Sequence, residues 1–389
     1  MKIYTFGAED APVLLLLPGT CCHWKSNFGA VIPLLADSFR VLCVSYDGFD
    51  ETEQTEFSTM LEETKKIEAY LKNHCGGHIR AAYGCSLGGS FVGLLAARQN
   101  IHMDYGILGS SDLDQASPLV ASLQTNLLLP LIYPVVRDGK FKAKFLQKQL
   151  EKHAKESGDY VKAFLKMFGD ARPYVTMQSC KNQFYSDLIT PLPDKIHVPG
   201  TQIHIFYALK MGKKYRARYQ QHFVHPVLHE QNLQHEELLA CHPEQWAHLV
   251  KSIALFKQLP NAVLFAAGPC WEGVDFPGDR VSLLIIARLP FPVPDPVSDA
   301  EKAKYPDLHS YIQAEVIPTM QKKLRQGFGR AIRTETDTCT VAILDPRAAP
   351  GGRYHRAALD ALPKMNMTQD IKDVEHFIRA VKGAEYFFD

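Results

Sequence analysis

The chain lacks the features that would set it apart from ordinary globular proteins. Its formal net charge is +1, so no overall excess of positive charge attracts nucleic acid or an anionic membrane, and such binding would need a local patch. Its nine cysteines include no C-x-x-C pair, which disfavours a disulfide framework or a zinc ribbon and favours a reducing compartment. We therefore expect a cytoplasmic protein.

We also expect no targeting or anchoring segment. The first ten residues turn acidic without an apolar core, unlike a signal peptide. No apolar run reaches membrane-spanning length, and the run 127–136 is broken by Pro130 and Pro134, so no membrane partner is expected. That run is interpreted as pocket lining or as core packing within a cap. The 389 residues, 46% of them hydrophobic, suffice for two folded domains.

The feature that is present is a serine flanked by glycines after a short apolar stretch. Gly84, Ser86 and Gly88 fit G-x-S-x-G, with strand composition at 79–83 and helix formers at 90–98. In such a nucleophile elbow the serine occupies a strained turn between strand and helix, and the glycines let the two elements approach. A tight glycine turn with an incidental serine is the alternative, but the flanking elements favour a nucleophile.

The loop after the buried strand 13–17 has two competing interpretations. Residues 19–26 partly match the phosphate-binding pattern G-x-x-x-x-G-K-[ST], but Trp24 stands where the second glycine belongs, and its indole would obstruct the backbone around a phosphate. We reject that interpretation. The other is half of an oxyanion hole, in which Thr20 N–H acts together with Leu87 N–H.

Strands and helices alternate along the first half of the chain. Strands are predicted at 41–46, 105–108 and 202–209, and a helix at 57–72. Such β-α-β order predicts a mostly parallel sheet with helices on both faces and with ligands at the carboxyl ends of the strands. Residues from about 115 to 199 are helical in pattern and are interpreted as a cap over the site.

Six histidines lie between His222 and His248. His225 and His229 could pair as metal ligands on a helix, but Pro226 disfavours a helix there and no H-E-x-x-H is present, so no metal site is expected. Each histidine could also be a surface or satisfied core residue.

One histidine has the position of a general base. His235 lies in a loop between a last strand and a helix that begins at Pro243. In the chain order serine, acid, histidine, this loop carries the residue that takes the proton from the nucleophile, here Ser86, and returns it to the leaving group.

Residues 1 to about 253 resemble the α/β-hydrolase superfamily through the motifs Leu17-Pro-Gly-Thr20, Gly84-Cys-Ser-Leu-Gly-Gly89 and His235-Glu-Glu-Leu-Leu239. The resemblance implies that fold, with a cap at about 115–199, and a third residue that orients the base. The family's usual position for this acid, just after the seventh strand, holds no carboxylate here. Relatives that place it after the sixth strand make Asp112 the candidate and Asp114 the reserve. A helix cap or turn is the alternative for both aspartates.

The alternation of strands and helices starts again in residues 254–389, which form a second predicted domain. Strands are predicted at 262–267, 282–287 and 340–344, and a helix at 308–324. Arginines spaced three apart on one helical face could hold phosphate oxygens or be ordinary surface charges.

Two motifs in this region resemble motifs five and six of DinG-type helicases, relatives of the iron-sulfur superfamily two helicases. They are Trp271-Glu-Gly-Val-Asp-Phe-Pro-Gly278 and Gln326-Gly-Phe-Gly-Arg-Ala-Ile-Arg333. The resemblance implies a partial RecA-like domain in which Arg330 and Arg333 reach the γ-phosphate of ATP. It places Gln326, Gly273 and Asp275 in nucleotide coupling or strand contact.

Half of such a motor is absent from the sequence, which has no complete Walker A loop, no D-E-A-H box and no four-cysteine cluster. ATP and Mg²⁺ would therefore bind only together with a motor half supplied elsewhere. We favour a serine hydrolase that acts on a small ester or related acyl substrate and needs no cofactor. The alternative is a nucleic-acid protein whose residues 255–389 act with such a partner.

Overall fold

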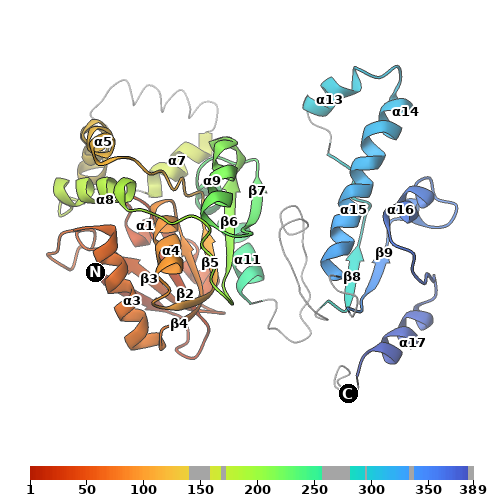
Figure 1. Cartoon of the computed structure of the whole chain (residues 1–389), viewed down its shortest axis with the longest axis horizontal. Coiled ribbons are helices and arrows are strands. Elements are labelled where there is room, and N and C mark those ends of the chain that lie inside the picture. The colour runs from red at the N-terminus through yellow and green to blue at the C-terminus, as the bar shows by residue number, and fades with distance from the viewer. Residues whose placement is uncertain (140–157, 168–171, 256–280, 294–295, 333–336, 384–389) are drawn as a thin grey trace. The chain divides into compact units, whose positions relative to one another are not determined.

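A computed structural model describes residues 1–139, 158–167, 172–255, 281–293, 296–332 and 337–383 (Figure 1). Contacts divide the chain into unit 1, Met1–Phe265, and unit 2, Ala266–Asp389. The boundary predicted from the sequence, after residue 253, lies near the end of the last described helix of unit 1. The strand predicted at 262–267 lies outside the described residues.

Unit 1 is built on one seven-stranded sheet in the order β1-β3-β2-β4-β5-β6-β7, with β1 antiparallel to β3 and the other pairs parallel. Strand order reverses between β2 and β4, and in open parallel sheets ligands bind outside the carboxyl ends of the strands at such a point. The strands are β1 (Lys2–Phe6), β2 (Val13–Leu17), β3 (Arg40–Ser45), β4 (His78–Gly84), β5 (His102–Leu108), β6 (Gln202–Ala208) and β7 (Val227–Gln231).

Helices pack against this sheet and above its carboxyl edge. The helix α3 begins after Thr59, whose hydroxyl accepts from Glu62 N–H, and it ends at Gly76 in the left-handed conformation. The helices of unit 1 are α1 (Trp24–Phe28), α2 (Ile32–Leu35), α3 (Met60–Cys75), α4 (Leu87–Arg98), α5 (Pro118–Asp138), α7 (Gly158–Met167), α8 (Met177–Ile189), α9 (Lys214–His222), α10 (Glu237–Cys241) and α11 (Pro243–Ala254).

The core of unit 1 follows from its apolar strands. Leu14, Leu15, Leu16 and Leu17 of β2 are fully buried, because a central parallel strand is covered by helices on both faces. The predicted strand 105–108 is the second half of β5, which begins three residues earlier at His102. Two of the first three residues of β5, His102 and Asp104, carry polar side chains, so hydrophobicity alone did not mark the start of the strand.

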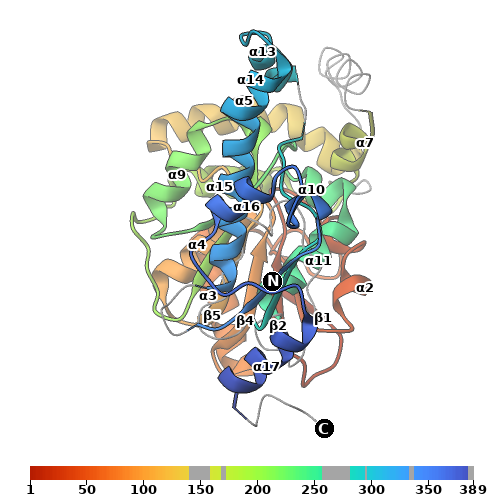
Figure 2. The same ribbon diagram turned by 90° about the vertical axis from the view of Figure 1, so that its right-hand side faces the viewer.

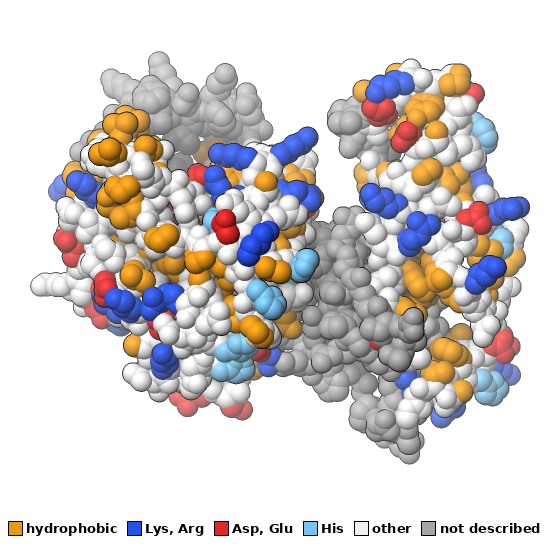
Figure 3. All heavy atoms as spheres, in the orientation of Figure 1, with side chains coloured by type: hydrophobic (Ala, Val, Ile, Leu, Met, Phe, Trp, Pro, Cys, Tyr) orange, Lys and Arg blue, Asp and Glu red, His pale blue; other side chains and the backbone are white. Residues whose placement is uncertain are grey.

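The cap between β5 and β6 contains α5, α7 and α8. Side chains at a four-residue spacing, Ala121, Thr125 and Leu129, are buried on one side of α5, which packs against α8. The opposite side exposes Leu119 and Leu127. Hydrophobic side chains gather over α5 in Figure 3. Residues 127–136 were predicted to line a pocket or to pack in the core of the cap, and only one side of the helix is buried in that way.

One described helix, α5, is long and apolar enough to cross a membrane by length and composition. The sequence prediction that no apolar run reaches this length missed it, because Pro130 and Pro134 were taken to interrupt the segment. Both prolines instead lie inside the continuous helix.

Unit 2 has its own small core around two parallel strands, β8 (Leu283–Ile286) and β9 (Thr340–Ile343). A long helical segment runs from α14 (Leu308–Tyr311) through a π-helical turn at Ile312–Val316 into α15 (Ile317–Ala331). The helix α16 (His355–Ala361) lies beside α15, where Gln321 Nε2 donates to the Ala357 carbonyl oxygen at 2.9 Å (Figure 2). The remaining described helices are α13 (Pro296–Lys302) and α17 (Ile371–Val381).

Candidate active site

Ser86 forms the turn between β4 and α4, as the sequence pattern predicts. Its backbone has φ 49° and ψ −112°, a conformation that costs free energy for a residue with a side chain and is found mainly at functional sites. A Cβ added at Gly84 would lie 2.0 Å from the Gly88 carbonyl, and one added at Gly88 would lie 2.1 Å from the Leu17 carbonyl oxygen. Both glycines are therefore needed for β2, β4 and α4 to meet at this turn.

The structure brings His235 to this serine from 149 residues further along the chain, with His235 Nε2 3.1 Å from Ser86 Oγ. The histidine lies between the end of β7 and the start of α10. Its backbone carbonyl accepts a hydrogen bond from the Tyr160 hydroxyl of the cap at 2.9 Å. The predicted nucleophile and the predicted base are thus within hydrogen-bonding reach, as general-base catalysis requires.

The two aspartates predicted as the third member lie against α9. Arg218 donates to the backbone carbonyl of Asp112 at 2.6 Å and forms an ion pair with the Asp114 carboxylate. Among the hydrogen bonds of the described residues, none joins either carboxylate to His235. The assignment of Asp112 as the orienting acid therefore stays a prediction.

A different carboxylate, which the sequence motif contains but to which no role was assigned, lies at the elbow. Glu236 is 3% exposed, and its Oε1 accepts from Ser86 N–H at 2.8 Å and from Ser110 N–H at 2.7 Å. Its Oε2 accepts from the Tyr83 hydroxyl at 2.9 Å. The only signal in the sequence was an acidic residue directly after the predicted base.

The loop after β2, residues 19–22, lies beside the elbow: a Cβ added at Gly19 would come within 3.4 Å of Cys85 Sγ. Three of its backbone amides donate hydrogen bonds of 2.6–3.1 Å to other groups of the protein. Gly19 N–H donates to Asn27 Oδ1, Cys21 N–H to Gln183 Oε1 and Cys22 N–H to the Gly19 carbonyl. Within the described hydrogen bonds, neither Thr20 N–H nor Leu87 N–H donates to an acceptor. Both amides thus remain candidates for the oxyanion hole.

The cap holds this loop in position. Arg172, which is 4% exposed, donates through Nη2 to the Cys21 carbonyl at 2.7 Å, and Gln183 of α8 accepts from Cys21 N–H. Cys21 itself has φ 54°, so the loop is fixed in a strained form by contacts on both sides of one residue. Trp24, which excluded the phosphate-loop interpretation, stacks on Tyr4 of β1 with ring centroids 4.4 Å apart.

One of the two histidines considered as metal ligands, His229, is buried beside another histidine. His229 lies on β7, fully buried, with its Nε2 2.8 Å from Nδ1 of His204 on the neighbouring strand β6. Burial lowers the pKa of His229 to about 4, so this imidazole is neutral at physiological pH. It is a core histidine with a side-chain partner.

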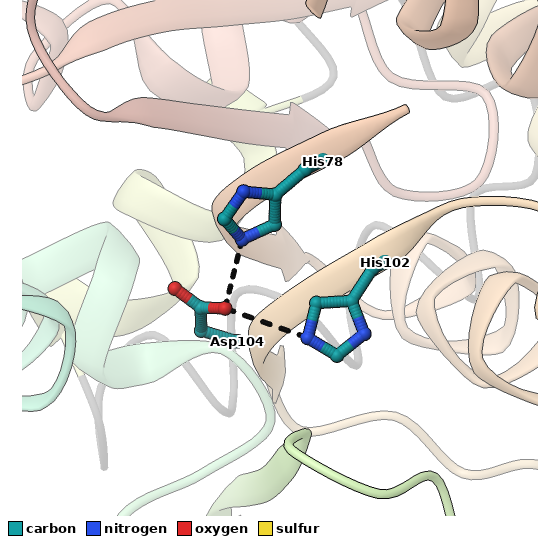
Figure 4. Close-up of side chains that lie close together, drawn as sticks. All are labelled: His78, His102 and Asp104. Carbon is teal, nitrogen blue, oxygen red and sulfur yellow. Dashed lines mark hydrogen bonds and ion pairs between the residues drawn. The ribbon is translucent and has the colours of Figure 1, made fainter. Parts of the chain in front are cut away.

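The described side chains that could hold a cation lie at the opposite end of the strands from Ser86. His78 and His102 face each other on β4 and β5, with Nε2 atoms 2.9 and 3.5 Å from Asp104 Oδ1 (Figure 4). Arg80 forms an ion pair with the other oxygen of the same carboxylate. Its positive charge would repel a cation, so we assign this cluster to ion pairing between the strands.

The predicted nucleotide and nucleic-acid residues belong to unit 2. Gln326 is exposed on α15, and Arg330 lies one turn further along the same helix. Gly273, Asp275 and Arg333 lie outside the described residues.

Comparison with a solved structure settles the fold of unit 1. A protein of the α/β hydrolase family from Desulfitobacterium hafniense matches 64% of this chain and 99% of its own with a TM-score of 0.53. Unit 1 has the α/β-hydrolase fold. The sequence identity is 17%, so the likeness establishes the fold alone. The fold class predicted from the sequence is confirmed.

Residues 196–365 match the family described as helicase C-terminal domain. The 3'-5' exonuclease DinG of Bacillus subtilis is 38% identical over 126 residues, 31% of this chain and 13% of that protein. The ATP-dependent DNA helicase DinG of Photobacterium profundum is 42% identical over 106 residues, 26% of this chain and 15% of that protein. The predicted resemblance is thus confirmed, and the chain spans only a small part of these relatives.

The family match begins inside unit 1, at residues that form β6 and β7. These strands pair with each other and with β5 in the α/β-hydrolase sheet. The first part of the matched range therefore belongs to the hydrolase fold in this structure. The part of the match that lies outside that fold is in unit 2.

Proposed function

We propose that unit 1 is a serine hydrolase that cleaves a small ester or related acyl bond. The observation that carries the proposal is the 3.1 Å contact between His235 Nε2 and the hydroxyl of Ser86 in its strained elbow. A serine hydroxyl is a weak nucleophile until an adjacent base takes its proton, and this pair supplies that arrangement.

In the proposed reaction, Ser86 Oγ attacks the carbonyl carbon while His235 Nε2 accepts the hydroxyl proton. Thr20 N–H and Leu87 N–H stabilise the oxyanion of the tetrahedral intermediate. The protonated imidazole then gives its proton to the leaving alcohol, and the C–O bond to that alcohol breaks. Water, activated by the same histidine, hydrolyses the acyl-enzyme and restores the serine. No step draws on a cofactor, and we place the protein in the cytoplasm.

A fluorophosphonate probe tests the proposal because it phosphonylates only activated serines. We expect one adduct on the intact chain by mass spectrometry, localised by digestion to the peptide that contains Ser86. Short-chain p-nitrophenyl esters should be hydrolysed, and prior labelling should remove that activity. A folded protein that gains no adduct would contradict the proposed function.

A second function is favoured by the family match of unit 2. We propose that residues 255–389 contact nucleic acid or nucleotide through their helicase-like motifs. Arg330 and Arg333 would reach the γ-phosphate of ATP, and Gln326, Gly273 and Asp275 would act in nucleotide coupling or strand contact. ATP and Mg²⁺ would then require a motor half from another chain. This rests on the likeness to relatives whose names describe a DNA helicase and an exonuclease.

Arg330→Ala in the full chain is expected to weaken binding of a fluorescent oligonucleotide about tenfold at low salt, because it removes a charge-assisted contact. The slope of log affinity against log salt should fall by about 1. Arg216→Ala removes an equal charge from α9 of unit 1 and should leave binding unchanged. Fluorescence polarisation across a salt series measures both. Equal binding by the wild type and Arg330→Ala would contradict this function.

A further inference from the structure

A buried carboxylate lies directly beneath the proposed nucleophile. Glu236 makes its three described hydrogen bonds at 2.7–2.9 Å with Ser86 N–H, Ser110 N–H and the Tyr83 hydroxyl. No Lys or Arg is among its partners in the described part of the chain. The carboxylate therefore faces three oriented dipoles, and such donors form stronger hydrogen bonds to an ionised acceptor than to a neutral one.

The surroundings are shaped to admit this side chain. A Cβ added at Gly109 would lie 2.3 Å from Glu236 Oε1 and 2.6 Å from the Tyr83 hydroxyl, so only glycine leaves room for the carboxylate. Tyr83 is fully buried, in edge contact with Trp246. Burial first, and the Glu236 charge next, raise the pKa of the Tyr83 phenol, which keeps it protonated as a donor.

The three donors and the acceptor come from different parts of the fold. Tyr83 lies near the end of β4, Ser86 lies in the turn between β4 and α4, Ser110 follows β5, and Glu236 directly follows His235. Glu236 also has φ 55°, a left-handed conformation that a glutamate adopts at a cost. The backbone that carries the base is therefore linked by one side chain to the backbone that carries the nucleophile.

We propose that Glu236 is a positioning residue that holds the amide of Ser86 and thereby sets the distance between Ser86 Oγ and His235 Nε2. This inference rests on the proposed hydrolase function. Glu236 would hold the elbow in its strained conformation and the loop of His235 against it at the same time. Its role is as an acceptor at a fixed position, because Oε1 alone bonds both backbone amides.

Two substitutions separate this role from a general effect of charge. Glu236→Gln keeps a carbonyl oxygen at the position of Oε1, and its NH₂ group can donate to a Tyr83 hydroxyl that has rotated to accept. Glu236→Ala removes every acceptor. We expect kcat for p-nitrophenyl ester hydrolysis to fall about 100-fold in Glu236→Ala, with KM little changed, and within about threefold of the wild type in Glu236→Gln. Tyr83→Phe, which removes a donor outside the elbow, should behave like Glu236→Gln.

Hydrogen–deuterium exchange gives a readout that does not depend on activity. Peptides that contain the amides of Ser86 and Ser110 should exchange at least about tenfold faster in Glu236→Ala than in the wild type, and at the wild-type rate in Glu236→Gln. If the wild type shows no hydrolysis or labelling, the proposed function fails, and the exchange measurement still decides the inference about Glu236.

Two results would overturn the inference while the hydrolase function stands. One is a Glu236→Ala protein with wild-type kcat and wild-type exchange at the elbow. The other is a Glu236→Gln protein that is as inactive as Glu236→Ala although its elbow amides remain protected from exchange. That result would show that catalysis depends on the charge of Glu236 and not on its hydrogen bonds to the amides. If Glu236→Ala does not fold, the kcat and exchange of Glu236→Gln alone decide between these outcomes.

Discussion

Ser86→Ala is expected to abolish fluorophosphonate labelling and to lower kcat for p-nitrophenyl ester hydrolysis by about 10⁴-fold or more. The substitution removes the only hydroxyl within hydrogen-bonding reach of His235 Nε2 among the described contacts, and with it the acyl-enzyme route. The smaller alanine side chain fits wherever serine does, so stability should change little. Intact-mass spectrometry and initial rates measure the loss.

The matched control is Ser117→Ala. Ser117 is exposed before α5, and its hydroxyl makes no capping hydrogen bond there. Labelling and turnover by this variant should equal those of the wild type. Hydrolysis that persists at the wild-type rate in Ser86→Ala would show that another group performs the reaction and would remove the basis of the proposed function.

His235→Ala is expected to have the second largest effect, a fall in kcat of about 10²–10⁴-fold, which is the usual contribution of a positioned general base. KM should change little, because the imidazole acts on the Ser86 proton and not on the bound substrate. The rate of fluorophosphonate labelling should fall with kcat, since both depend on activation of the same hydroxyl. Stopped-flow labelling and steady-state kinetics measure the two rates.

His242→Ala provides the comparison for this variant. His242 is exposed at the start of α11, and its side chain makes no capping hydrogen bond. Its removal should leave both rates unchanged. An unchanged kcat in His235→Ala would assign the base elsewhere, even if Ser86 were still labelled.

Much of the fold could be predicted because its elements are marked locally. The strand at 13–17 is an uninterrupted apolar run between turn residues, and the structure reproduces its bounds as β2. The β-α-β alternation predicted the parallel sheet, which the structure shows with a single antiparallel edge strand. The first strand, β1, was not predicted, because its residues are only partly buried at the sheet edge.

The candidate site was predictable where a local conformation demands particular residues. The steric limits around Gly84 and Gly88 leave a glycine pattern that can be found without coordinates. His235 could be placed because chain order in the resembling family assigns the base to the loop after the last strand. Both predictions concern residues whose role follows from their position in a motif.

The surroundings of the predicted acid, Asp112, could not be predicted in the same way. Carboxylates occur in many loops, and which of them points toward the site depends on contacts made far along the chain. Arg218 lies 104 residues after Asp114 in the sequence and forms an ion pair with its carboxylate. This contact holds the loop of Asp114 toward α9. No feature of the sequence near Asp112 indicates this contact.

By itself, the sequence determined that a serine elbow exists, that a parallel sheet carries it, and that a helicase-like segment follows. These depend on glycine spacing, apolar periodicity and motifs, all of which are short-range. Only the tertiary structure decided that Glu236, and not an aspartate after β5, bonds the amide of the proposed nucleophile. The reason is physical: a buried carboxylate is stabilised by whichever donors the packed strands bring to it, and strands separated by many residues in the chain supply them.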